Sequence, residues 1–360
     1  MSRFLFILLI LPAWLFSGYI DYTGYGEVLN FSSVNSASRG GAGLTTDPLL
    51  NPANPGEMGY SVYMMMGADY QTESETQSVY DNYNNRIGNL TISQSRSVHV
   101  APYGAYGAIQ YDKLGGMFYA GMVRDYFYHH EIIQRDDFYQ TTGIIKQTGS
   151  GQGIAAGISM NYQFPVVSFG VAVNYINLNQ QKKYQHIFYQ PIAEDTVVES
   201  SFDQTGLLYR VGSVVHVLPQ VDAALILQSK NQDIQQPLEV GIGLNYFARA
   251  IIPARVYFDF YYKFYNQLDE NLQDTKIYCF GIENQFSRHV KILLGGGYEE
   301  NCFNSEADAA YFSGGFEFHQ HNLIIQTSMD YRQKQYPKQM NDITIHDNSM
   351  NFMVGLGYNL

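Results

Sequence analysis

The chain has 360 residues, of which 15% are aromatic and only 15% are charged, and its formal net charge is -12. Soluble domains average about 25% charged residues, so this composition instead suits a protein that exposes apolar surface to lipid and lines a wet interior. The sequence offers no basic patch to neutralise phosphates, which argues against a nucleic-acid-binding protein.

The N-terminus has the pattern of a secretory signal peptide. Arg3 is followed by an apolar run from Phe4 to Phe16 and then by the small residues Ser17 and Gly18. This run is shorter than the roughly 20 apolar residues that cross a bilayer as a helix. We therefore predict a signal peptide over residues 1–18. No other stretch approaches the length of a membrane helix, so we expect any membrane crossing to be made by strands.

The next segment, residues 19–56, is prone to turns. From Ser36 to Gly56 it is rich in Gly, Pro, Ser and Asn, which disfavour regular helix and strand. Since a long series of strand-like segments follows, we expect residues 19–56 to form a plug or hatch inside a closed sheet. The alternative is a loose tail whose end merely starts the first strand.

Residues 57–360 alternate between apolar and mixed positions, the pattern of a strand with two different faces. In 256–265, for example, the even positions are mainly aromatic, whereas the odd positions include Asp259 and Lys263. A soluble sandwich would alternate in the same way, with its apolar face in the core. Alternation alone therefore does not distinguish a sandwich from a barrel.

The lengths of the connections favour the barrel. We predict about fourteen strands, each long enough to cross a bilayer when tilted (about 9–11 residues). Tight turns such as 112–114 alternate with longer polar connections, of which the longest are 71–96, 130–150 and 182–201. Short turns at one end and long loops at the other are typical of outer-membrane barrels. We therefore predict an all-β fold, a transmembrane barrel of about fourteen antiparallel strands over residues 57–360, in contact with outer-membrane lipid. The predicted strands are 57–70, 97–111, 115–129, 151–164, 166–181, 202–218, 220–231, 237–249, 252–265, 274–287, 289–301, 307–320, 322–334 and 347–360.

The last strand ends with Gly355, Gly357, Tyr358 and Leu360. This spacing resembles the C-terminal signal that the barrel-insertion machinery reads, although the usual last residue is aromatic. We therefore expect that machinery to be a partner of the chain. The two cysteines, Cys279 and Cys302, fall on different predicted strands with no visible register match, so we expect free thiols rather than a disulfide or a zinc site.

Besides its turn-prone composition, the segment over residues 19–56 contains a recognisable motif. A Gly-rich stretch is followed by an acidic residue and then by Asn-Pro-Ala. It resembles the N-terminal signature of the FadL-like outer-membrane superfamily, which includes fatty-acid and aromatic-hydrocarbon transporters and the PorV and PorQ proteins of type IX secretion. The resemblance implies a plugged barrel of about fourteen strands. It also implies a plug or gating role for Arg39, Gly40, Gly41, Asp47, Asn51, Pro52 and Ala53. Within such a plug, we expect Arg39 and Asp47 to pair with lumen charges, for which the candidates are Glu239, Glu283, Asp330 and Arg210.

A second feature lies in the second predicted strand. Pro102 is disfavoured within a closed ladder. We expect the strand to begin at Tyr103; the alternative is a kinked wall in which Pro102, Gly104 and Gly107 form a lateral opening. The Met residues at 64–66, 117 and 122 either face lipid or adapt to a greasy ligand.

The sequence indicates no enzyme. It contains no nucleophile elbow and no phosphate-binding fingerprint, and we expect no catalytic residues, no cofactor and no metal site. His319 and His321 share a strand face but lack a third ligand, and His129 and His130 point to opposite faces.

Three functions stay open at this point. The first is passage of a small hydrophobic ligand across the outer membrane. The second is docking or shuttling of secreted proteins together with secretion-system proteins, as the PorV and PorQ resemblance implies. The third is an unselective porin.

Overall fold

The computed structural model describes residues 27–28, 32–54, 60–81, 83–135, 140–189, 194–249, 252–337 and 343–359. The predicted signal peptide over 1–18 lies outside the described residues, as does most of 19–31. None of the described helices is long and apolar enough to cross a membrane.

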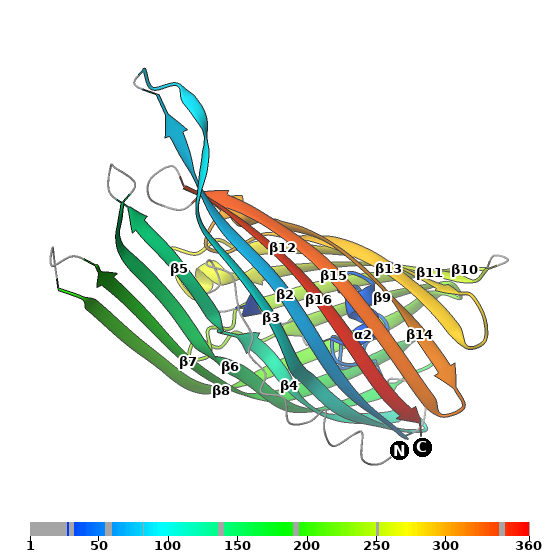
Figure 1. Ribbon diagram of the computed structural model, residues 1–360. Coiled ribbons are helices and arrows are strands. Elements are labelled where there is room, and N and C mark those ends of the chain that lie inside the picture. Colours follow the sequence, from blue (N-terminus) through cyan, green and yellow to red (C-terminus); the bar gives the residue numbers. More distant parts are fainter. Residues whose placement is uncertain are drawn as a thin grey trace, which may run out of the picture.

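One antiparallel sheet dominates the described chain (Figure 1). Its strands are β1 (Glu27–Val28), β2 (Tyr60–Tyr80), β3 (Arg86–Tyr111), β4 (Leu114–Asp125), β5 (Tyr128–Arg135), β6 (Thr141–Gln163), β7 (Val167–Phe188), β8 (Thr196–Leu218), β9 (Val221–Gln228), β10 (Leu238–Ala248), β11 (Ala254–Phe264), β12 (Thr275–Gln285), β13 (Val290–Glu299), β14 (Ala309–Gln320), β15 (Leu323–Pro337) and β16 (Ile343–Asn359). The helical elements are α2 (Val34–Ser38), η1 (Tyr265–Gln267) and η2 (Ser305–Ala307).

The sheet closes into a barrel. Successive strands pair from β2 to β4 and from β6 to β16, β16 pairs with β2, and β4 pairs with β6. Of the sixteen strands, β1 pairs only with β4 and β5 only with β6, so neither completes the ring. The wall therefore has fourteen strands, which confirms the predicted barrel.

The two faces of the wall differ as the alternation predicted. In β11, Asp259 and Lys263 turn inward and are buried, whereas Phe258 on the outer face is 45% exposed. The same holds for β16, in which Met353 is buried and Phe352 is exposed. A sandwich would bury its apolar face, but here the apolar face is the outer one. This is the arrangement of a barrel whose outside meets lipid.

The strands on one side of the barrel are far longer than predicted. β3 has 26 residues and β8 has 23, although about 9–11 residues cross a bilayer. The hairpin of β2 and β3 runs on past the shorter strands (Figure 1). The long polar connections predicted over 71–96, 130–150 and 182–201 are thus wrong, because they are mostly strand. Outside lipid the outer face of a strand no longer needs apolar residues, so apolar alternation stops while the hydrogen-bonded ladder continues.

Pro102 lies within β3, so the expectation that this strand begins at Tyr103 is wrong. Met65 pairs with Gly104 and Met66 with Pro102, which leaves Tyr103 as a bulge. On its other edge β3 pairs with β4 only from Gly104 onward. Since proline removes a ladder donor, it is tolerated at bulges and on unpaired edges, and Pro102 has both.

The wall has a seam next to this bulge. Before Gly104, over residues 86–102, β3 pairs with β2 only, and β5 pairs with β6 only. The described residues of β3 and β5 lie close together, yet no ladder joins them in the part of the chain that the structure describes. We call this line the β3–β5 seam. At the base of the seam, β4 continues past its last pairing with β3. There its freed edge pairs with β1 at Arg124 and Asp125.

Candidate functional site in the barrel lumen

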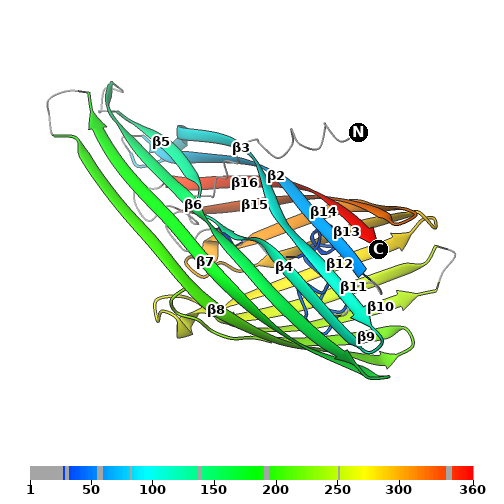
Figure 2. The same cartoon turned by 90° about the horizontal axis from the view of Figure 1, so that it is seen from below.

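Residues 32–54, which we call the inner segment, lie within the ring of strands (Figure 1, Figure 2). Ser33 caps α2, since its hydroxyl accepts a hydrogen bond from the backbone N–H of Ser36. Glycines follow at 40 and 41 with positive φ, where the chain leaves the helix and turns. A helix of five residues has little stability of its own, so contacts within the segment and with the wall hold it.

Asp47 organises the inner segment from within. Its carboxylate accepts hydrogen bonds from the backbone N–H groups of Ser33 (2.8 Å) and Leu49 (2.9 Å). It therefore joins the start of the segment to its later turn, and it is 2% exposed. Although the sequence suggested a charged partner on the wall, Asp47 instead bonds to backbone of its own segment.

Arg39 ties the segment to the wall. Its guanidinium lies 3.1 Å from the carboxylate of Glu283 on β12, one of the partners considered from the sequence, and 4.1 Å from the ring centre of Tyr257. Burial disfavours the charged form, but nearby Tyr257, Glu283, Asp47 and Asp259 outweigh it and raise the pKa of Arg39. Arg39 therefore stays charged inside the barrel.

Asp259 on β11 provides a second attachment. It is fully buried, and one carboxylate oxygen accepts hydrogen bonds from the backbone N–H groups of Gly43 (2.6 Å) and Leu44 (2.8 Å). Hydrogen bonds to an ionised acceptor are about twice as strong as neutral ones. This contact explains why the segment bends where its Gly-rich stretch ends.

Asn51 and Pro52 lie against a part of the wall where Gly212 has no side chain. The Asn51 amide donates to the carbonyl of Leu44 (2.9 Å) and its oxygen accepts from the N–H of Ala53 (3.0 Å). A Cβ on Gly212 of β8 would come within 1.9 Å of that amide oxygen. Gly212 therefore allows the Asn-Pro-Ala stretch to touch the backbone of the wall.

The inner segment separates two cavities. The loop-side cavity, of about 100 Å³, lies on the side of the longer connections, and Gly41, Leu49 and Leu50 form part of its lining. The turn-side cavity, of about 360 Å³, faces the short turns, and Arg39 and Asp47 contribute to its lining. The segment thus lies between the outer and the inner part of the lumen.

The lining of the loop-side cavity is more apolar than polar, and its charged residues are Arg124, Arg210, Glu239 and Lys263. Its lining includes Leu178, Leu208, Ile226, Ile234 and Ile277 from the wall and from the connection after β9. An apolar cavity of about 150 Å³ can hold benzene, so the loop-side cavity approaches the size of one aromatic ring.

Three polar groups on the wall of this cavity have no hydrogen-bond partner among the described residues. They are Nε of Arg210, Nε2 of Gln228 and the hydroxyl of Tyr261. The oxygen of the Gln228 amide accepts a hydrogen bond from Arg210 (2.6 Å), which leaves the amide nitrogen Nε2 as a donor. The cavity can therefore offer hydrogen-bond donors to an acceptor on a bound molecule.

The predicted lateral residues are only partly brought together. Pro102 and Gly104 flank the bulge at the base of the β3–β5 seam, whereas Gly107 is paired within the wall to both β2 and β4. The side chain of Tyr103 points inward, over Gly67, and its hydroxyl accepts a hydrogen bond from the Asn351 amide (2.9 Å).

The structure also places the methionines, the cysteines and His319 that the sequence singled out. Met64 is exposed on the outer face, but Met65, Met117 and Met122 are buried inside. Cys279 and Cys302 are not joined in a disulfide, as predicted. His319 lies 2.5 Å from Glu317.

Sequence reasoning missed the attachment role of Asp259 and the cavity role of Tyr261. Both were placed on one face of the predicted strand over 252–265, and a carboxylate on an inward face is a signal that something inside must satisfy it. The sequence does not indicate which backbone groups do so.

Comparison with known proteins supports the fold. No family model and no curated protein matches the sequence. Among solved structures, the Pseudomonas putida toluene transporter TodX superposes with a TM-score of 0.66 at 12% identity, covering 92% of this chain and 99% of that one. A Pseudomonas aeruginosa FadL homologue gives 0.65 at 9%, covering 93% and 99%. The Ralstonia pickettii toluene transporter TbuX gives 0.60 at 11%, covering 91% and 98%.

The chain has the fold of the FadL-type transporters. Identities this low establish the fold and not the cargo. A closed barrel with an apolar outer face is also the form in which strands cross a membrane, since closure lets neighbouring strands satisfy one another's backbone groups without water. The protein is therefore an outer-membrane barrel with a FadL-type fold.

Proposed function

We propose that this barrel passes small hydrophobic compounds across the outer membrane and that the inner segment is its plug. The observation that carries the proposal is the loop-side cavity, whose lining is more apolar than polar and which ends at the inner segment. A compound entering from the loop side finds apolar surface there, and burial of apolar area provides the driving force for binding. The FadL-type fold agrees with this proposal.

The plug role rests on how the inner segment is held. Arg39, Asp259 and Asn51 fix it through buried polar contacts, beside the apolar contacts that Val34, Leu44 and Leu49 make with the wall. Polar contacts of this kind can be exchanged for water or for other polar partners when the segment shifts. In this account a ligand in the loop-side cavity displaces Leu49 and Leu50, and the segment moves away from the wall.

The ligand class is a hydrophobic molecule that carries a hydrogen-bond acceptor. The donors of Arg210, Gln228 and Tyr261 favour such a molecule over a pure hydrocarbon, because a buried donor without a partner costs about 1–3 kcal/mol. A fatty acid has this chemistry, whereas toluene has only the apolar part.

For the exit we propose the lumen or a lateral opening at the bulge. Pro102 and Gly104 lie where β3 and β4 part, and Gly107 lies three residues further into the paired wall. Val123 and Arg124 of β4 line the loop-side cavity close to the point of separation. A ligand that left here would enter the bilayer directly.

The alternative role in protein secretion gains no specific support, since the similar structures named above are transporters. Secretion-system proteins and the barrel-insertion machinery stay predicted partners. Co-purification of secretion components with the folded barrel would favour the alternative.

Uptake tests the proposal directly. The full chain would be produced in a Gram-negative host that lacks its own fatty-acid transporter, and uptake of radiolabelled palmitate and toluene would be measured. We expect faster uptake than with an empty vector, with the larger increase for palmitate. Equal rates, in cells whose outer membranes contain the folded barrel, would contradict the proposal.

A further inference from the structure

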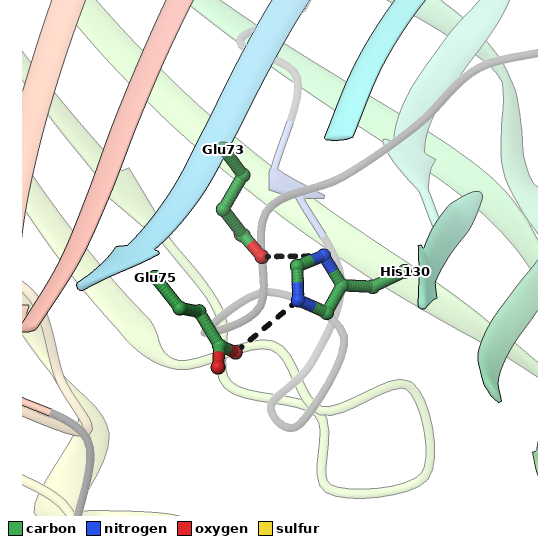
Figure 3. Close-up of side chains that lie close together, drawn as sticks. All are labelled: Glu73, Glu75 and His130. Atoms are coloured by element: carbon green, nitrogen blue, oxygen red, sulfur yellow. Dashed lines mark ion pairs between the residues drawn. The ribbon is translucent and has the colours of Figure 1, made fainter. Parts of the chain in front are cut away.

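A buried cluster of two carboxylates and one imidazole lies outside the lumen site. Glu73 and Glu75 come from β2, and His130 comes from β5 (Figure 3). Their side chains are 2%, 0% and 0% exposed, respectively. Nδ1 of His130 lies 3.5 Å from the Glu73 carboxylate, and Nε2 lies 3.3 Å from that of Glu75. One ligand atom from each of the three residues can be chosen so that all lie within 4.8 Å of one another.

The cluster spans the β3–β5 seam. Glu75 and Ser93 are register partners on β2 and β3, whereas His130 lies on the other side of the seam. The hydroxyl of Ser93 reaches across the seam, 2.9 Å from Nε2 of His130 and 2.8 Å from the carbonyl of Glu131. Tyr128, also on β5, donates a hydrogen bond to Glu73 (2.8 Å). Side chains here join two strands that no described backbone ladder joins.

The hydrogen bonds fix how the imidazole is arranged. The single hydroxyl proton of Ser93 is donated to the carbonyl of Glu131, since a carbonyl can only accept. The Ser93 oxygen therefore accepts from Nε2–H of His130. In a neutral imidazole Nδ1 then carries the lone pair, and it is fully buried and without a hydrogen bond among the described residues. It faces a carboxylate oxygen of Glu73, so two electron-pair donors point at one another.

A cation between these two groups would satisfy both of them, and the chemistry of the ligand atoms indicates which kind. Imidazole nitrogen together with carboxylate oxygen suits zinc and related divalent transition metals rather than calcium or magnesium, which prefer oxygen alone. A metal-bound histidine typically donates its other ring N–H to a neighbouring acceptor, which is the role that Ser93 has here. Ligand atoms around a tetrahedral zinc ion with bonds of about 2.1 Å lie roughly 3.4 Å apart, close to the 3.5 Å between Nδ1 and Glu73.

We propose that Glu73, Glu75 and His130 bind a divalent transition-metal ion of the zinc type, which links β2 to β5 across the seam. His130 supplies Nδ1 and each glutamate supplies one oxygen, with the carboxylate of Glu75 turning toward the ion. Three protein ligands leave a fourth position for water. The ion stabilises the seam where the backbone does not.

Zinc binding to the purified full-length barrel in detergent tests the proposal, by equilibrium dialysis and elemental analysis. We expect one zinc ion per folded barrel in the wild type. Glu75→Gln and His130→Gln should each weaken binding about 100-fold or more, because even the loss of a group that only supports a ligand typically costs 10- to 100-fold. His129→Gln is the matched control, since the neighbouring His129 side chain is 51% exposed and outside the cluster.

Heat-modifiable migration on gels would show that each variant is folded. Zinc should also raise the midpoint of thermal unfolding in the wild type and in His129→Gln, but not in the two cluster variants. Absence of stoichiometric zinc would overturn the proposal and leave a proton as the shared cation. Binding that is lost in His129→Gln but kept in His130→Gln would overturn it as well. Neither measurement depends on whether the barrel transports anything.

Discussion

The guanidinium of Arg39 lies 3.1 Å from the carboxylate of Glu283, and the two side chains are only 4% and 14% exposed. One residue belongs to the inner segment and the other to the wall, 244 positions away. A buried ion pair of this kind holds the segment in place mainly because loss of either partner would leave the other charge buried and uncompensated.

Replacing Arg39 with Ala should therefore loosen the inner segment. Breaking a buried pair costs about 3–5 kcal/mol, and here Lys291, 3.6 Å from Glu283, would offset part of that cost. We expect the segment to become cleavable by protease in a barrel that still folds. Lys183→Ala is the control, since it removes the exposed pair of Lys183 with Glu199 (2.8 Å) and should change stability by less than about 1 kcal/mol. Equal resistance to protease in both variants would contradict the role of Arg39.

A methyl group on the wall should push the segment away. A Cβ on Gly295 would come within 2.1 Å of the carbonyl carbon of Arg39, which cannot yield as a flexible side chain could. We expect Gly295→Ala to give a folded but leaky barrel, seen as greater sensitivity of the cells to vancomycin. Gly116→Ala should have no such effect, because its Cβ would meet nothing nearer than 3.7 Å. Unchanged vancomycin sensitivity in both variants would show that the segment does not close the lumen.

Tyr261→Phe tests the ligand class. This change removes a hydroxyl that has no hydrogen-bond partner among the described residues, so the barrel should lose little stability. Palmitate uptake should fall about fivefold, the equivalent of one hydrogen bond of about 1 kcal/mol, and toluene uptake should stay the same. Tyr278→Phe is the control, since Tyr278 is exposed on the outer face. A parallel loss for both compounds would mean that the hydroxyl does not contact an acceptor on the ligand.

The barrel could be predicted from the sequence because lipid imposes period-2 alternation on every strand that it touches. For the same reason the prediction stopped too early at the membrane boundary. The continuation of β2 through Glu73 and Glu75 has polar residues on both faces, so it was predicted as part of the polar connection over 71–96. This error also hid their approach to His130.

The candidate site could be predicted only as a motif. Asn51 and Arg39 were singled out from the Gly-rich stretch and its Asn-Pro-Ala, but their partners come from distant strands. Asp259 lies more than 200 positions from the N–H groups that it binds, and such pairings depend on barrel closure and strand stagger. Barrel closure and strand stagger cannot be predicted from the local sequence around Arg39 or Asn51.

The measurement that most directly tests whether the inner segment is a moving plug uses a native thiol. A Cβ on Gly41 would lie 3.4 Å from Sγ of Cys279, within reach of a disulfide, so Gly41→Cys should lock the segment to the wall when oxidised. Because φ at Gly41 is +79°, cysteine there is strained, and the comparison is between the oxidised and reduced forms of the same variant.

We predict that palmitate uptake stops on oxidation and returns on reduction, whereas the wild type, whose two cysteines are free, responds to neither treatment. Equal uptake by the reduced protein and by protein shown by mass spectrometry to be cross-linked would contradict the account.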